Sequence, residues 1–415
     1  MRYSTKERLI ANLLTSFPKL KQMIKYTYQR FNLIRFKKPY SFKTKLRIIK
    51  LSHNTSDSSF FGYYDRSPMS KDGKHIIFHS TAFDTRQKPK KCNEIDIVLY
   101  DVQSGQAKTI STTKAFNWQQ GAKLQWINND AFIFNDFDAK NNKYISKIYS
   151  ISKNEFTHID IAIYDVFDHY GLSLNYERLT QLRPDYGYFA KSDLPSHFNH
   201  SKEGISKVDL KNNSSTLLIS IENIIHSHFQ KSMIDADHLV NHIMISPNGE
   251  HFIFLHRWFC NGVRNDALML SDKMGATLNC LSDNQMVSHC FWKNNQEVVG
   301  YMRGSDQQDH YLVINIDTLE TNKLDVLNGF GDGHPHINNN LLVTDTYPNK
   351  SRMKELLLYD FDLDKLTTLG EFFESFDFYG ETRCDLHPRI SHDQNYLFID
   401  SVHEGKRHLY MFEND

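Results

Sequence analysis

Histidine recurs at four similar positions in the second half of the chain, each close to an apolar run that indicates a β-strand. The four are His242, His289, His334 and His387. A neutral imidazole binds divalent transition metals, and histidine exchanges protons near neutral pH. If the four imidazoles converge, they can form a divalent-metal site or an acid–base cluster. A single histidine at such a position is more often explained by a structural hydrogen bond to a neighbouring loop, but for four at similar positions the two explanations are about equal.

Arginine, tyrosine and carboxylate side chains stand near these histidines or in two separate segments. They occur in Tyr63-Tyr-Asp-Arg66, Arg183-Pro-Asp-Tyr-Gly-Tyr188, His256-Arg-Trp258 and Arg383-Cys-Asp-Leu-His-Pro-Arg389. A planar guanidinium matches a carboxylate, while tyrosine can donate to hydroxyls, stack on a sugar ring or exchange a proton. These are the groups that recognition of an anionic glycan requires.

The strands and turns that would position these groups recur as a repeated unit. From about residue 46 onward, a polar turn, a short alternating apolar strand, a second strand and another turn recur. The clearest copies are the turns Ser67–Gly73 and Ser246–Gly249, which lead into the strands Ile76–Phe78 and Phe252–Phe254 as hairpins do. The spacing of about fifty residues fits four-stranded propeller blades, if one copy lies in the less regular stretch 140–235.

The sequence therefore predicts an all-β fold, a single β-propeller of about seven four-stranded blades over residues 46–415. The strand Leu46–Leu51 is expected to join the last blade and close the ring, which would remove a free sheet edge.

Residues 1–45 form a basic extension to this acidic domain. Residues 1–50 contain 14 Lys and Arg and one acid, Glu7, so they carry a net charge of +13 and the rest of the chain carries −13. Apolar residues recur between these charges at helical spacing, at Leu9, Ile10, Leu13, Leu14, Phe17, Leu20, Met23, Ile24, Tyr28 and Phe31. The pattern is typical of a basic amphipathic helix, which we expect to contact an anionic membrane surface through residues 1–42. The alternative is a solvated helix docked on the acidic propeller.

The apolar runs and the cysteines of the sequence indicate its cellular compartment. The sequence has no apolar run of the roughly 18 residues that a membrane span needs, and it lacks a secretory signal at its N-terminus. The five cysteines are widely spaced without a C-x-x-C pair, which argues against a disulfide framework or a cysteine-built zinc site. We expect a cytoplasmic protein with reduced thiols, in peripheral contact with the inner membrane face.

Short motifs across nearly the whole chain after residue 55 carry a resemblance to a known family. They are Phe61-Gly-Tyr-Tyr-Asp-Arg-Ser-Pro68, Asn117-Trp-Gln-Gln-Gly121, Asn241-His242, His256-Arg-Trp258, Asp332-Gly-His334, Arg383-Cys-Asp-Leu-His-Pro-Arg389 and His403-Glu-Gly405. In these motifs the chain resembles the β-propeller polysaccharide lyases of the oligogalacturonate-lyase type and related propeller proteins of bacterial surface-polysaccharide gene clusters.

The resemblance implies a divalent metal, most simply manganese, that neutralises the substrate carboxylate while a nearby group removes the proton at C5. It implies His334 and His387 as metal ligands and His289 as a third. The chain departs from the family around the shared His-Pro, where Cys384 and Arg389 stand in place of a Gln and a second His. This departure leaves open a metal-free alternative, in which Arg383 or Arg389 neutralises the carboxylate and His242 or Tyr188 is the base.

The leading hypothesis is an enzyme that cleaves a uronic-acid-containing glycan by β-elimination. Its partner would be an acidic oligo- or polysaccharide and not a nucleic acid. The predicted catalytic residues are His242, Tyr188, Arg257, Arg383 and Arg389, the substrate-binding residues are Arg183, Tyr64, Asp65, His256 and Asp385, and the metal or acid–base residues are His289, His334 and His387. Two alternatives are a membrane-associated enzyme of glycosyl transfer or hydrolysis in surface-polysaccharide synthesis, and a non-catalytic propeller that binds glycan.

Overall fold

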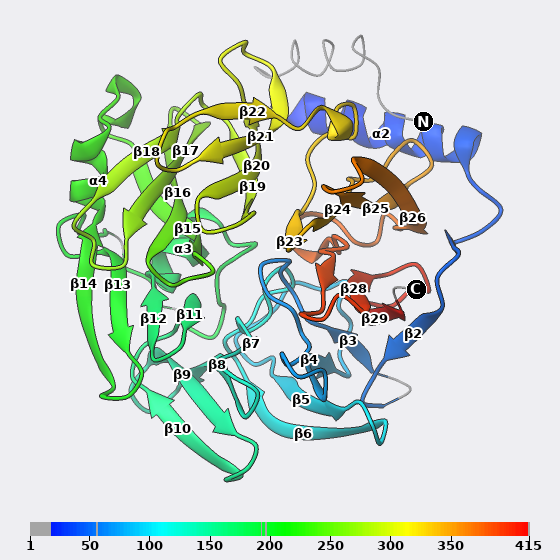
Figure 1. Cartoon of the computed structure of the whole chain (residues 1–415), viewed down its shortest axis with the longest axis horizontal. Helices are drawn as coiled ribbons and strands as arrows, with labels where there is room; N and C mark the ends of the chain where they lie inside the picture. Colours follow the sequence, from blue (N-terminus) through cyan, green and yellow to red (C-terminus); the bar gives the residue numbers. More distant parts are fainter. Residues whose placement is uncertain (1–17, 55–56, 192, 196, 414–415) are drawn as a thin grey trace.

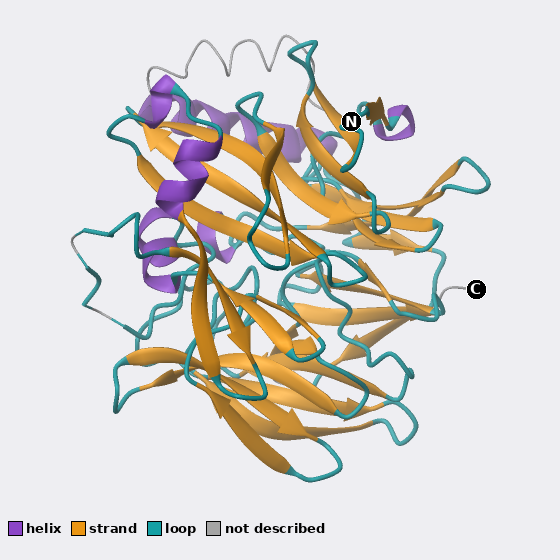
Figure 2. Cartoon of the chain, turned by 60° about the vertical axis from the view of Figure 1, so that its left-hand side comes forward, coloured by secondary structure: helices purple, strands orange, loops and turns teal. Residues whose placement is uncertain are grey.

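Seven antiparallel sheets follow one another along the chain and form a ring (Figure 1). The computed structural model describes residues 18–54, 57–191, 193–195 and 197–413. Six sheets have four strands and one has five, so the structure confirms the predicted seven-bladed β-propeller. Figure 2 shows the twisted blades in orange and the few helices in purple.

The strands fall into blades in chain order. Blade 1 contains β3 (Ser58–Phe60), β4 (His75–Thr81), β5 (Ile95–Asp101) and β6 (Gln106–Thr113); blade 2 contains β7 (Gln125–Trp126), β8 (Ala131–Asp138), β9 (Lys143–Ser150) and β10 (Glu155–Ile159). Blade 3 contains β11 (Asp165–Phe167), β12 (Tyr170–Ser173), β13 (Gly204–Asp209) and β14 (Ser214–Ser220); blade 4 contains β15 (Asp237–Ile245), β16 (His251–Cys260), β17 (Val263–Asp272) and β18 (Leu278–Ser282). Blade 5 contains β19 (Val287–Trp292), β20 (Glu297–Arg303), β21 (Asp309–Asn315) and β22 (Thr321–Lys323).

The last two blades combine strands from both ends of the chain. Blade 6 contains β23 (His336–Asn338), β24 (Leu341–Asp345), β25 (Met353–Asp360), β26 (Lys365–Phe373) and β1 (Phe42–Thr44); blade 7 contains β27 (Arg389–Ile390), β28 (Tyr396–Ser401), β29 (His408–Glu413) and β2 (Ile48–Leu51). The helices are α2 (Pro18–Phe36), α3 (Tyr176–Leu182), α4 (Ile221–Ser227) and the 3₁₀ turns η2 (Lys231–Met233), η3 (Asp325–Leu327) and η4 (Gly380–Thr382).

Strand β2 closes the ring as predicted. It pairs antiparallel with β29, with Ile48 opposite Phe412, so the blue strand β2 lies beside the red strand β29 in Figure 1. The sequence did not predict β1, which adds a fifth strand to blade 6 with Lys43 opposite Glu371. The sheets of the propeller therefore begin at Phe42, within residues 1–45.

The basic extension contains the helix α2, as its apolar spacing predicts. Leu20, Met23, Ile24, Tyr28 and Phe31 lie in this helix. The earlier residues of the predicted pattern, Leu9, Ile10, Leu13, Leu14 and Phe17, lie outside the described residues. Among the described residues, no helix has the length and apolar character that crossing a membrane requires.

Polar side chains in the second strand of four blades connect each of those blades to the next. Each follows a short, mainly apolar stretch. Each accepts a hydrogen bond from a backbone N–H group that lies in the following blade or in the segment leading into it. The four contacts are His79 to Ala122 (3.1 Å), Asn135 to Ile163 (2.8 Å), Asp345 to Leu386 (3.0 Å) and Asp400 to Phe61 (3.0 Å). We call these side chains latch residues. They matter because a buried N–H without an acceptor costs free energy.

The latch residue His79 gives a pH dependence that can be tested. Burial lowers its pKa from 6.5 to about 3. Below about pH 6.5 the unfolded chain therefore binds a proton that the folded chain does not, so stability present above that pH is lost on acidification. At pH 5 the loss from this side chain is about 2 kcal/mol, because one pKa unit is worth about 1.4 kcal/mol.

We expect His79→Asn, which carries the side chain of the latch residue Asn135, to lose less stability than the unmodified protein between pH 7 and pH 5. Urea unfolding at both pH values measures this difference. Equal losses in the two proteins would contradict the assignment.

Candidate functional site

Four histidines from successive blades meet near the centre of the ring. The ring centroids of His242 and His289 lie 6.0 Å apart, those of His289 and His334 4.1 Å, and those of His334 and His387 4.4 Å. Tyr63, which follows β3 of blade 1, contacts both His242 and His387 at 5.2 and 5.1 Å. Blades 4 to 7 and blade 1 thus contribute to one site, which we call the histidine cluster (His242, His289, His334 and His387).

Irregular backbone turns these side chains inward. The register of β15 shifts between Asn241 and Met244, and that of β19 shifts between Val287 and Cys290, so His242 and His289 both lie at bulges. His242 and His387 have φ angles of 52° and 43°, in the left-handed region that non-glycine residues rarely adopt. Bulges and positive φ angles cost stability and are common next to functional sites.

The carboxylate of the latch residue Asp345 holds two of the four histidines. Its Oδ1 accepts the backbone N–H of His334 at 2.9 Å and lies 2.7 Å from His334 Nδ1. Its Oδ2 accepts the backbone N–H groups of Leu386 and His387 at 3.0 and 3.2 Å. A Cβ on Gly333 would lie 2.1 Å from the Asp345 carbonyl oxygen, so glycine is required where the two segments approach.

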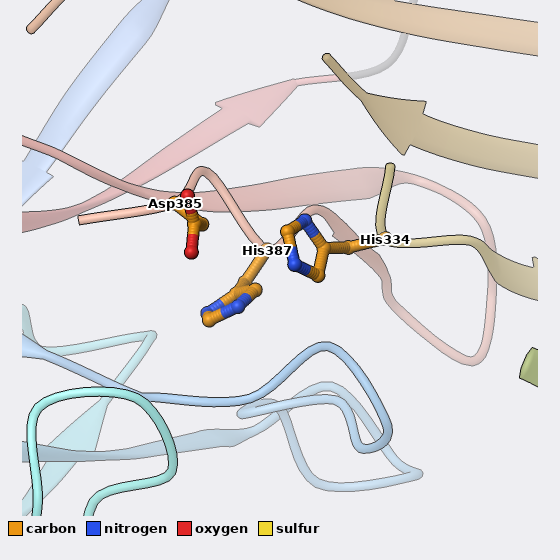
Figure 3. A group of neighbouring side chains, drawn as sticks. All are labelled: His334, Asp385 and His387. Carbon is orange, nitrogen blue, oxygen red and sulfur yellow. The ribbon is translucent and has the colours of Figure 1, made fainter. Parts of the chain in front are cut away.

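His334, Asp385 and His387 form a group that could hold a metal ion (Figure 3). One ligand atom from each lies within 4.8 Å of the others, and all three residues are buried. His387 Nδ1 lies 2.7 Å from the Gly62 carbonyl oxygen, as His334 Nδ1 does from Asp345. In both rings Nε2 is buried without a hydrogen-bond partner. Metal-ligating histidines usually have this arrangement, with one nitrogen fixed by an outer acceptor and the other free.

The protonation of these imidazoles follows from burial and neighbouring charge. Burial lowers the pKa of His387 well below its ordinary value, and nearby His334 and Arg389 lower it further. Burial also acts to lower the pKa of His334, but the Asp345 carboxylate outweighs it and the pKa is raised. The pKa of Asp385 is lowered to about 2, because the charges of Arg383 and His334 outweigh its burial. Two imidazoles and an ionised carboxylate suit a divalent ion such as manganese or zinc.

His242 pairs with Tyr63 on the other side of the cluster. The Tyr63 hydroxyl oxygen lies 2.8 Å from His242 Nδ1, and the two rings are stacked. Burial lowers the pKa of His242 well below its ordinary value, and the charge of Arg257 lowers it further, so the ring is neutral. Burial raises the pKa of Tyr63 well above its ordinary value, so its hydroxyl keeps the proton.

Arg183 and Arg383 lie beside this pair in a chain of ion pairs. Arg183 pairs with Asp185 at 3.0 Å, Arg383 reaches the same carboxylate at 3.3 Å, and Arg383 also pairs with Asp385 at 2.8 Å. Arg383 Nη2 donates to the Tyr186 hydroxyl at 3.4 Å. Arg183 Nη1 is buried without a hydrogen-bond partner. These partly exposed guanidiniums are therefore placed to meet an anionic group.

Four other predicted site residues lie around the cluster as supports. Arg389 is fully buried and donates to the Tyr63 carbonyl oxygen at 2.9 Å and to Asp400 at 2.9 Å. Arg257 pairs with Asp266 at 2.9 Å. The ring centroid of Tyr64 lies 5.5 Å from that of His334, and the Tyr64 hydroxyl donates to the Cys290 carbonyl oxygen at 3.0 Å. Asp65 pairs with buried Lys123.

Two predicted residues lie elsewhere. The Tyr188 hydroxyl accepts from Asn135 Nδ2 at 2.8 Å, and its ring stacks on Tyr176 at 4.3 Å. His256 lies in a separate group, with Nε2 2.9 Å from His238 Nδ1 and Nδ1 3.2 Å from His228 Nε2. Structural neighbours thus surround both side chains, and the structure does not bring them to the histidine cluster.

Sequence reasoning missed Asp345 and did not single out Tyr63 or Asp332. Ser288 and His289 both contact the Asp332 carboxylate, at 2.6 and 3.2 Å. A signal for Asp345 does exist, because a carboxylate at the end of the buried strand Leu341–Asp345 needs donors from outside its own strand. Tyr63 and Asp332 stand within motifs already noted, but only the fold shows which side chains point inward.

Several solved structures share the fold of this chain. An oligogalacturonate lyase in complex with manganese superposes with a TM-score of 0.62 at 15% identity, covering 91% of this chain and 97% of that one. An oligogalacturonate lyase from Vibrio parahaemolyticus superposes with a TM-score of 0.58 at 15% identity, covering 90% and 96%. The tricorn protease superposes with a TM-score of 0.52 at 12% identity, covering 88% of this chain and 34% of that one. At these identities the similarity shows the propeller fold.

No protein-family model matches the sequence, and no curated protein matches it. The geometry of the site must therefore carry any assignment of its chemistry.

Replacing Asp345 tests whether it organises the cluster. In Asp345→Asn an NH₂ group would replace one carboxylate oxygen and face an N–H donor, so the segment of either His334 or His387 would lose its acceptor. If His334 and His387 hold a metal ion, the affinity for Mn²⁺ should fall roughly 10- to 100-fold, the usual effect of removing an outer partner of metal ligands. Isothermal titration of the purified protein with Mn²⁺ measures this. His79→Asn, which alters the latch between blades 1 and 2, is the control, and equal affinity in both variants would contradict the role of Asp345.

Proposed function

We propose that the protein is a carbohydrate-active enzyme that cleaves a uronic-acid-containing glycan by β-elimination at the histidine cluster. The observation that carries this proposal is the convergence of two unpartnered Nε2 atoms, on His334 and His387, with the Asp385 carboxylate. A neutral histidine and two guanidiniums lie next to this group. The fold similarity to an oligogalacturonate lyase that contains manganese supports the same chemistry.

The residues present fit a divalent ion. His334, His387 and Asp385 would hold it, with His289 beside them. When bound, such an ion supplies positive charge that stabilises the negative charge developing on a uronate carboxylate. Asp345 and the Gly62 carbonyl oxygen fix the two imidazoles, so little reorganisation is needed on binding.

His242 is the proposed base, because it is neutral and partly exposed within the site. In the tautomer with its proton on Nδ1, the ring donates to the Tyr63 oxygen and Nε2 carries the free lone pair. In the proposed reaction Nε2 takes the C5 proton, a C4–C5 double bond forms and the C4–O bond breaks. An incoming carboxylate raises the pKa of His242 from its depressed value, which makes the ring a better base. The protonated Tyr63 hydroxyl can supply a proton to the departing oxygen.

Arg183 and Arg383 are the proposed contacts for the acidic oligosaccharide. Both side chains are only partly covered, and Arg183 Nη1 has no hydrogen-bond partner to lose when a carboxylate arrives. Arg183, together with Arg257 and Lys123, also makes the surroundings of His242 electropositive. Such a charge distribution favours an anionic substrate over a neutral one.

A panel of uronate oligosaccharides tests this function. We expect the protein with Mn²⁺ to generate the ultraviolet absorbance of a C4–C5 unsaturated product from at least one of them. We expect His242→Ala to reduce the rate by roughly 10²- to 10⁴-fold, the usual contribution of a general base.

The matched control is His226→Ala, an exposed histidine on α4, which should leave the rate unchanged. New reducing ends without the absorbance would assign hydrolysis instead of elimination. Glycan binding without any product would assign a non-catalytic propeller, and either result would overturn the proposal.

A further inference from the structure

Helix α2 has one face against the propeller and an apolar face directed away from it. Asn32 is 3% exposed, and Gln29, Leu33 and Phe36 are partly buried, so these four positions form the packed face. Their spacing places them on one side of a helix. The exposed apolar residues are Leu20 (43%), Met23 (61%), Ile24 (40%), Phe31 (58%) and Ile34 (82%). Their spacing of three, four or seven residues places them on the other side, and we call them the outer stripe.

Contacts with blade 6 and with the loop that follows its strand β26 fix the orientation of this helix. The Tyr26 ring lies 5.8 Å from the Phe376 ring, and the Arg30 guanidinium lies 5.3 Å from the same ring. Beyond the helix, Lys38 Nζ donates to both oxygens of Glu371 on β26, at 2.7 and 2.6 Å. The outer stripe cannot turn toward the propeller without breaking these contacts. Packing in the core of the propeller therefore does not explain why the side chains of the outer stripe are apolar.

We infer that the outer stripe of α2 binds an anionic lipid surface. Soluble proteins rarely expose a contiguous apolar row, and such a row usually marks an interaction site. Lys25 and Arg35 are both exposed on the same helix, within a segment of net charge +13 over residues 1–50. A helix with an apolar stripe and basic residues is the kind that lies in the interface of an anionic membrane.

The positive charge of this segment favours contact with anionic lipid over contact with a second copy of the protein. Two copies joined through the outer stripe would bring two strongly basic segments together, and like charges oppose that contact. A surface of anionic headgroups instead complements the charge while the apolar side chains enter the boundary with the acyl chains. This placement does not depend on the proposed reaction, so each can fail without the other.

Vesicle flotation of the full chain tests the inference. The vesicles contain phosphatidylcholine and phosphatidylglycerol in equal parts, or phosphatidylcholine alone. We expect binding to the anionic vesicles, weaker binding at high salt and little binding to the neutral ones. The triple variant Met23→Gln, Phe31→Gln and Ile34→Gln should reduce the partition coefficient at least roughly tenfold. Lys25→Gln with Arg35→Gln should reduce it roughly fivefold for each charge removed.

The matched control replaces three exposed apolar residues of the propeller, Val263→Gln, Met274→Gln and Leu363→Gln. This variant should bind the anionic vesicles as the unmodified protein does. All variants alter exposed side chains, so unchanged thermal unfolding should accompany them.

Four results would overturn the inference. One is the absence of binding to anionic vesicles, and another is equal binding by the outer-stripe variant and its control. The third is a dimer of the unmodified protein, detected by light scattering, that the outer-stripe variant converts to a monomer, because this would assign the stripe to self-association. If deletion of residues 2–17 abolished binding while the outer-stripe variant bound normally, the contact would lie in those residues and the inference would also fail.

Discussion

Four N–H donors from two successive blades reach the carboxylate of Asp345. Two belong to His334 and the others to the backbone of Leu386 and His387, at distances between 2.7 and 3.2 Å. A buried carboxylate is stable only when its charge is compensated in this way. The same contacts that join blades 6 and 7 therefore orient the two imidazoles whose Nε2 atoms remain unpartnered. Structural and candidate functional roles meet in one side chain.

The other residues of the site lie in charged or strained segments that the closed ring brings together. His242 and His387 adopt positive φ angles, and two bulges turn His242 and His289 inward. Such features persist only where surrounding contacts hold them. Here Arg389 supports the segment of Tyr63 and Gly62, and Gly62 in turn accepts from His387. Residues of blades 7 and 1, which are neighbours in the closed ring, thus hold the histidine cluster in place.

The sequence allowed the fold to be predicted because turns and apolar strands recur at a spacing typical of propeller blades, and because a strand at Leu46–Leu51 could join the last blade and remove a free sheet edge. It indicated the four histidines through their similar place before strands. It could not separate Tyr188 and His256 from the cluster. Tyr188 lies in an irregular segment after α3, and His256 lies within β16, where the side-chain direction reverses from one residue to the next. Asp345 was missed because its four donors lie 11 to 42 residues away, and only the ring brings them together.

In the proposed function, Asp345 orients His334 and His387 so that they bind a divalent ion together with Asp385. The most direct measurement is anomalous diffraction at the manganese edge from crystals grown with Mn²⁺. The account predicts one strong peak in contact with Nε2 of His334, Nε2 of His387 and a carboxylate oxygen of Asp385. A peak elsewhere, or no peak at concentrations that saturate binding in solution, would contradict it.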